Sequence, residues 1–141
     1  MKKTVLAFGT FDLLHPGHLY YLREAKKQGD KLVVVVARDK TSLKVKKRKP
    51  VYSQTDRLQL VKALEFVDQA FLGDEKDYLK HIKKFKPAVI ALGYDQEPVV
   101  RDLKQKLKTA GLNCSIKRIK AFQKHKHKSS KIKKRIKRAK N

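Results

Sequence analysis

Residues 5–18 of the chain read VLAFGTFDLLHPGH. The apolar run at residues 5–8 is typical of a buried strand, and the helix-period segment at 17–28 follows directly after the motif. Between them, Gly9 allows the backbone to turn closely past a ligand, and Pro16 suits the first turn of a helix. This stretch therefore predicts a strand, a short loop and a helix in immediate succession.

The same alternation continues along the chain. Strand-like runs occur at residues 5–8, 32–37, 67–72, 88–92 and 113–119, and helix-period segments at 17–28, 54–64, 78–85 and 99–110. Gly111 follows the last of these helices, where a left-handed cap is expected. Alternating strands and helices predict parallel strands joined by right-handed crossovers. We therefore expect an α/β fold: a Rossmann-like three-layer sandwich with a five-stranded parallel sheet and helices on both faces.

Length and composition narrow the class of protein. The 141 residues predict a single domain, 1–141, and the net charge of +24 predicts anionic partners. Thirteen of the 37 Lys and Arg residues lie in a basic C-terminal segment, about 117–141, which contains no acid. The single cysteine, Cys114, excludes an internal disulfide and fits a reducing, cytoplasmic location. The longest apolar run, 32–37, is far shorter than the roughly 20 residues of a membrane span, so we expect no membrane partner.

Candidate binding residues lie where the strands end. In open parallel sheets, ligands bind outside the carboxyl ends of the strands, at the point where the strand order reverses. The first helix begins there, and its unpaired amide groups form an anion site beside His15 and His18. The two rings, three residues apart, can face the same side and hold a polyphosphate. Alternatively, these histidines are solvent-facing cap residues or part of a metal site.

At these residues the chain resembles the nucleotidyltransferase superfamily with the His-x-Gly-His signature, in particular its cytidylyltransferase-like branch. The resemblance covers about residues 4–136 and is similar in detail to the archaeal FAD synthases. It continues at Ala37-Arg38-Asp39, Lys44, Lys46, Arg48, Lys49-Pro50, Asp56-Arg57-Leu58, Val67-Asp68, Leu72-Gly73-Asp74 and residues 91–96, ALGYDQ. It implies an enzyme that transfers AMP from ATP to FMN, giving FAD and pyrophosphate.

The resemblance also implies a set of site residues. Those expected to bind the nucleotide are Thr10, Phe11, His15, Pro16, Gly17, His18, Gly93, Asp95, Phe122, Ser129 and Ser130. Those expected to be catalytic are His15, His18 and Lys44, and the candidates that neutralise phosphate charge are Lys46, Arg48 and Arg57. A divalent ion, Mg, Mn or Co, is expected with ATP, and the residues do not identify its ligands.

Several of these assignments have a structural alternative. The basic connection 38–52 is either a phosphate-binding loop or a solvated one. Arg57 either closes the nucleotide site or pairs with Asp56 or another nearby acid. Asp95 belongs either to a nucleotide contact or to an ordinary turn, and Phe122 is either a stacking residue or a core aromatic.

Two other functions remain open from the sequence. One is a cytidylyltransferase acting on glycerol 3-phosphate or a phosphorylated amino alcohol. Such enzymes usually place two acids after the glycine, where this chain has Tyr94 after Gly93, so ATP and FMN are favoured. The other is a nucleic-acid-binding protein, because +24 predicts non-specific binding to RNA or DNA at low salt. The family resemblance further implies a homodimer.

Overall fold

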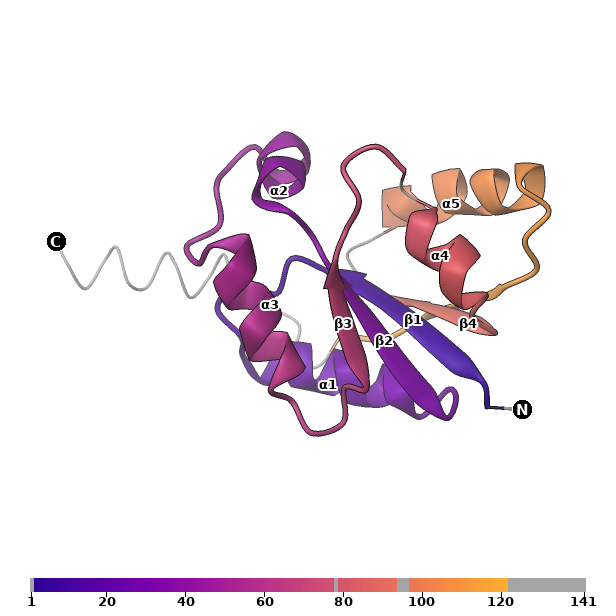
Figure 1. The fold of residues 1–141 in the computed structure, drawn as a ribbon, viewed down its shortest axis with the longest axis horizontal. Coiled ribbons are helices and arrows are strands. Elements are labelled where there is room, and N and C mark those ends of the chain that lie inside the picture. Colours follow the sequence, from indigo (N-terminus) through magenta and orange to yellow (C-terminus); the bar gives the residue numbers. More distant parts are fainter. Residues whose placement is uncertain (1, 78, 94–96, 122–141) are drawn as a thin grey trace, which may run out of the picture.

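The computed structural model describes residues 2–77, 79–93 and 97–121 (Figure 1). Its elements follow in the order β1 (Thr4–Gly9), α1 (Pro16–Lys26), β2 (Lys31–Val36), α2 (Asp39–Lys46), α3 (Gln54–Lys62), β3 (Gln69–Leu72), α4 (Lys80–Phe85), β4 (Val89–Leu92), α5 (Glu97–Thr109) and β5 (Ser115–Arg118). Every strand and helix expected from the sequence is present, with ends shifted by a few residues. Gly111 has φ +70, so the predicted left-handed position after α5 is confirmed.

The five strands form one parallel sheet in the order β3-β2-β1-β4-β5. The chain builds outward from β1 through β2 to β3 and then crosses back to place β4 on the other side of β1. The strand order therefore reverses between β1 and β4. The carboxyl ends of these two strands, Gly9 and Leu92, mark the position at which open sheets of this type bind ligands.

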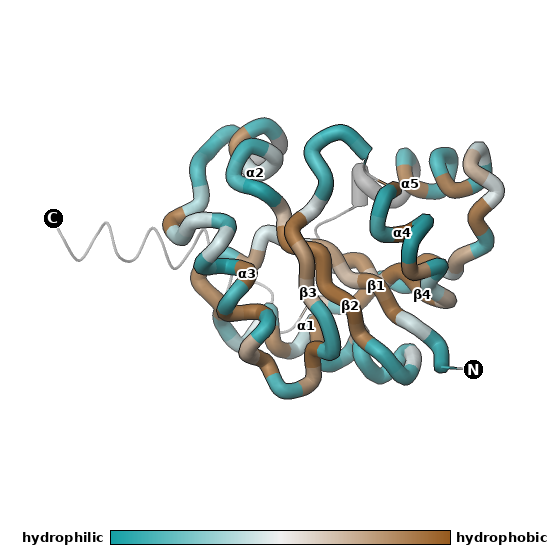
Figure 2. The backbone as a smooth tube through the Cα atoms, in the orientation of Figure 1, coloured by the Kyte–Doolittle hydropathy of each residue, from teal (hydrophilic) through white to brown (hydrophobic). Residues whose placement is uncertain are grey.

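Helices cover both faces of the sheet, as expected (Figure 1). Alternate residues of β1 point in opposite directions: Val5 and Ala7 join the cluster under α1 and α3, and Leu6 joins the cluster under α4 and α5. All five side chains from Leu32 to Val36 in β2 are buried, as a central parallel strand requires. In Figure 2 the strands are mostly coloured as hydrophobic, whereas hydrophilic and hydrophobic residues alternate along the helices around them.

The first half of the predicted connection 38–52 is a helix, α2, so the sequence interpretation of that segment as a loop is wrong there. Its outward Leu43 is 50% exposed, whereas Ser42 is buried. A helix that packs a polar side chain inward lacks the apolar periodicity by which helices are recognised. Its start is instead fixed by a tertiary contact, because the Asp39 backbone N–H donates to Gln54 Oε1 at 2.9 Å.

Lys47 ends α2 in the left-handed conformation, with φ 57 and ψ 26. A side chain with a Cβ is strained in this region, whereas glycine is not. We expect Lys47→Gly to raise the free energy of unfolding by about 1 kcal/mol, measured by urea denaturation. The exposed neighbour Lys49→Gly, which relieves no such strain, is the matched control. A Lys47→Gly variant no more stable than the wild type would contradict the expectation.

No helix in the described part of the chain is long and apolar enough to cross a membrane.

Candidate active site

His15 and His18 form the start of α1 and cap each other. His15 is the N-cap residue, and its Nδ1 accepts the Gly17 backbone N–H at 3.0 Å. His18 Nδ1 accepts the His15 backbone N–H at 3.3 Å, and the two rings stack with centroids 3.9 Å apart. Because Nδ1 is the acceptor in each ring, the neutral imidazole carries its proton on Nε2. The motif thus sets two adjacent ring N–H donors at the start of α1. The unpaired amides expected there are not found, because Pro16 has no N–H, the Gly17 N–H donates to His15 Nδ1 and the His18 N–H donates to the His15 carbonyl at 2.9 Å.

The buried Phe11 ring packs against His18 of this pair. Its side chain is only 3% exposed, and its ring lies edge-on to His18 at 5.6 Å and stacks on Tyr21 at 6.3 Å. A Cβ on Gly9 would lie 2.6 Å from the Phe11 ring, so Gly9 is needed for this ring rather than for the approach of a ligand, as the sequence interpretation had it. The nucleotide contact predicted at Phe11 can therefore involve only its backbone.

The loop that follows β1 is strained. Phe11 and Leu13 both have φ 54, in the left-handed region that residues with a Cβ rarely adopt. Such conformations persist where surrounding contacts determine them, and they concentrate in binding loops.

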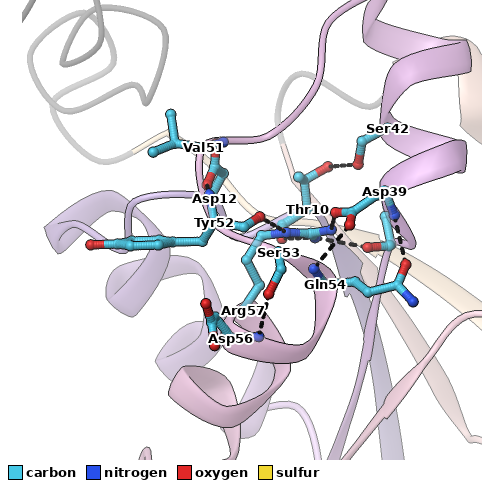
Figure 3. A network of polar contacts seen from close by, with 11 residues as sticks. Thr10, Asp12, Asp39, Ser42, Val51, Tyr52, Ser53, Gln54, Asp56 and Arg57 are labelled. Carbon is cyan, nitrogen blue, oxygen red and sulfur yellow. Dashed lines mark hydrogen bonds and ion pairs between the residues drawn. The ribbon is translucent and has the colours of Figure 1, made fainter.

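Asp12 fastens this loop to the segment before α3. Its carboxylate is 4% exposed, with Oδ2 accepting the Val51 N–H at 2.7 Å and Oδ1 accepting the Tyr52 N–H at 3.0 Å (Figure 3). The consecutive residues Val51 and Tyr52, 39 and 40 positions further along the chain, are thereby held against the loop. Asp12 is thus a structural anchor, with both carboxylate oxygens directed to backbone amides.

Arg57 lies at the centre of the same network and is 0% exposed. Its Nη1 donates to the carbonyls of Thr10 and Ala37, both at 2.7 Å, and its Nε donates to the Tyr52 carbonyl at 3.1 Å. Its Nη2 forms an ion pair with Asp39 Oδ1 at 2.7 Å (Figure 3). One guanidinium thus joins the loop after β1, the end of β2, the start of α2 and the segment before α3.

These contacts decide between the two interpretations of Arg57. A side chain buried among four protein partners does not reach a phosphate, so its assignment as a phosphate-neutralising residue is corrected. The acid that it pairs with is Asp39, which lies 18 residues away in the sequence. Asp56 is instead the third residue of α3, where its backbone N–H is capped by Ser53 Oγ at 3.2 Å.

Tyr21 links the ends of β1 and β4, a contact that the sequence interpretation missed. The ladder between β1 and β4 is paired as far as Ala7 and Ala91 and then opens. There the Tyr21 hydroxyl donates to the Ala91 carbonyl at 2.6 Å and lies 3.3 Å from both the backbone N and O of Phe8. The hydroxyl therefore replaces direct contacts between the strands and separates their ends, close to His18 on the preceding turn of α1.

The remaining predicted residues are Gly93, three basic residues on or just after α2, and four residues that the structure does not describe. Gly93 follows β4 directly and so lies at the point where the strand order reverses, beside the end of β1. Lys44 is exposed on α2, Lys46 is the last residue of that helix, and Arg48 is exposed just beyond it. Asp95, Phe122, Ser129 and Ser130 lie outside the described residues.

Charged groups also line a groove of about 260 Å³ at the outer edge of β3, away from the histidine pair. Backbone N–H groups of Asp77 and Lys76, with help from Lys80, lower the pKa of Asp74 to about 2. Burial lowers the pKa of His81, whose Nε2 lies 3.0 Å from the Leu72 carbonyl. These two groups stabilise the start of α4 and the end of β3.

A parallel sheet whose first strand leads into a histidine-capped helix start is the architecture of a nucleotidyltransferase, and the family match assigns the chain to that class. Residues 6–135 match the model of the cytidylyltransferase-like family, to which this chain belongs.

Individual relatives agree with this assignment. The chain is 48% identical over 122 residues to an FAD synthase of Methanothermus fervidus, covering 84% of this chain and 83% of the relative. It is 49% identical over 133 residues to an FAD synthase of Archaeoglobus profundus, covering 94% and 84%. A crystal structure of a protein from Thermoplasma volcanium, described as a lipopolysaccharide core biosynthesis protein, superposes with a TM-score of 0.81 at 43% identity, covering 86% of this chain and 99% of that one.

Proposed function

We propose that this chain is an FAD synthase, an enzyme that transfers AMP from ATP to FMN and releases pyrophosphate. The observation that carries the proposal is the identity of nearly one half, over more than four fifths of the chain, to archaeal FAD synthases. The anion site formed by His15 and His18 gives the proposal its chemistry.

In the proposed reaction, a phosphate oxygen of FMN bonds to the α-phosphorus of ATP. The bond from that phosphorus to the bridging oxygen breaks, and its electron pair leaves with pyrophosphate. A phosphate monoester has a second pKa of about 6, so the nucleophile is already ionised near neutral pH and needs no general base. The protein's task is to align two anions and to stabilise the charge that moves between them.

We assign this task to donors rather than to a base. The Nε2–H groups of His15 and His18, at the positive end of the α1 dipole, contact the reacting phosphate and the charge that develops on it. The charge of the triphosphate is neutralised by Lys44 and Lys46 of α2 and by Arg48, two residues beyond the end of that helix. Gly93, at the end of β4, leaves room for the nucleotide, and Asp95, which lies outside the described residues, is proposed as a second contact.

A divalent ion that accompanies ATP would withdraw negative charge from its phosphates. Within the described ranges, no group of three or more His, Cys, Asp or Glu could hold a metal ion. The carboxylate of Asp12, in the loop after β1, already accepts hydrogen bonds from two backbone N–H groups. These residues do not fit a resident metal site, and the roles assigned above do not depend on one.

The decisive experiment offers the purified protein ATP or CTP with FMN, glycerol 3-phosphate or phosphoethanolamine, in Mg, Mn or Co. We expect FAD, identified by mass, and pyrophosphate from ATP and FMN. A CDP-linked product would overturn the choice of substrates and keep the fold class. No turnover in any combination, with nucleic-acid binding that survives about 0.3 M salt, would favour the nucleic-acid alternative.

A further inference from the structure

Ser42 occupies an unusual position on α2. Its side chain is 2% exposed, whereas the neighbours on either side, Thr41 and Leu43, are exposed. A serine gains little from burial by itself, because its hydroxyl must replace the hydrogen bonds it made to water. The polar contact it makes on the inner side of α2 is therefore the feature to explain.

That contact is with the loop that follows β1. Ser42 Oγ lies 3.3 Å from Thr10 Oγ1, and Thr10 is the first residue after β1 (Figure 3). Thr10 itself is only partly buried, at the carboxyl end of β1 where the strand order reverses.

Both sides of this hydroxyl pair are held by the Arg57 network. Arg57 Nη1 fixes the Thr10 carbonyl at 2.7 Å, and its Nη2 fixes Asp39 in the first turn of α2 at 2.7 Å. Asp39 and Gln54 then cap each other's helices, with N···O distances of 2.9 and 3.3 Å. The backbone segments that carry the two hydroxyls are therefore held in place by the side chains of Arg57, Asp39 and Gln54.

We propose that Ser42 is a positioning residue that acts through Thr10. Each hydroxyl has one proton to donate. When Ser42 Oγ–H donates to Thr10 Oγ1, the Thr10 proton is left to point away from α2, toward the reacting phosphate. Thr10 thereby becomes a fixed donor to the developing charge, and its orientation is set by the same helix that carries Lys44. This inference rests on the proposed FAD synthase activity.

A double-mutant cycle on the rate of FAD formation tests the proposal. We expect Ser42→Ala to lower kcat about fivefold, with the KM for ATP unchanged, since one hydrogen bond is misdirected in the transition state. Thr10→Ala should cost more, and adding Ser42→Ala to it should cost nothing further. Ser42→Thr keeps the hydroxyl and should retain the wild-type rate. Thr41→Ala, the exposed neighbour, is the matched control and should match the wild type.

The outcomes separate the inference from the function on which it rests. Additive losses in the double variant, or a Ser42→Ala variant with unchanged kcat, would overturn the role of Ser42 while the function stands. So would a loss that appears only in thermal stability, because that is what a structural serine would show. Absence of FAD with the wild-type protein would overturn the proposed function, and the inference with it.

Discussion

Replacing His18 with glutamine, or His15 with asparagine, is expected to lower kcat for FAD formation by about 10²–10³-fold, the loss typical of removing one oriented donor to transition-state charge. These two replacements preserve the caps of α1. Asparagine is a favourable N-cap residue, and glutamine three residues later can accept the N-cap amide, as His18 does at present. The loss would therefore report on the imidazole Nε2–H groups rather than on the helix.

The measurement is steady-state formation of FAD and pyrophosphate, with the thermal midpoint recorded for each variant. His81→Gln is the matched control: it removes a histidine from α4, in the layer on the opposite face of the sheet from α1, and should leave kcat unchanged even if stability falls. A rate within tenfold of the wild type for both His18→Gln and His15→Asn would exclude the proposed role of the pair.

The second large effect is on stability. Arg57→Met is expected to lower the free energy of unfolding by about 3–5 kcal/mol, because it leaves Asp39 and three backbone carbonyls without their common donor. Urea denaturation measures this loss. Arg57→Lys retains the charge without the planar fork of donors, so its free energy of unfolding should lie between those of the wild type and of Arg57→Met.

Arg23→Met provides the control for Arg57→Met. Arg23 is exposed on α1 and lies over the Phe66 ring at 5.4 Å, so its replacement should cost no more than about 1 kcal/mol. If the two methionine variants were equally stable, the buried network would not hold the loop as described.

Because Arg57 fixes the Thr10 carbonyl, the Arg57→Met variant should also lose catalytic rate at temperatures where it remains folded.

Local patterns were sufficient for most of the fold. The apolar runs and the segments of helical period identified five strands and four helices, since burial between two layers leaves a continuous apolar run and burial of one face leaves a 3.6-residue period. The helix α2 was missed because it lacks such a period. It packs Ser42 inward and leaves Leu43 outside, so its sequence carries no apolar period.

The site was predicted unevenly for a related reason. The pair His15 and His18 was recognisable because capping and spacing are local properties of a helix start. The role of Arg57 depended on Asp39 and Thr10, which are 18 and 47 residues away, so two interpretations were equally consistent with the sequence. Tyr21 gave no local signal, because its bridging of Phe8 and Ala91 exists only once β1 and β4 lie side by side.

The sequence by itself determined the alternation of elements, the histidine-capped start of α1 and the family, because each depends on contacts within a few residues or on a motif of fixed spacing. The tertiary structure decided which polar side chains are bonded within the scaffold. Arg57 was a candidate site residue in the sequence, yet it directs its guanidinium to Asp39 and to backbone carbonyls from distant segments, as Asp12 directs its carboxylate to distant backbone amides. The physical reason is that a buried charge must find partners, and the fold alone determines which groups come within reach.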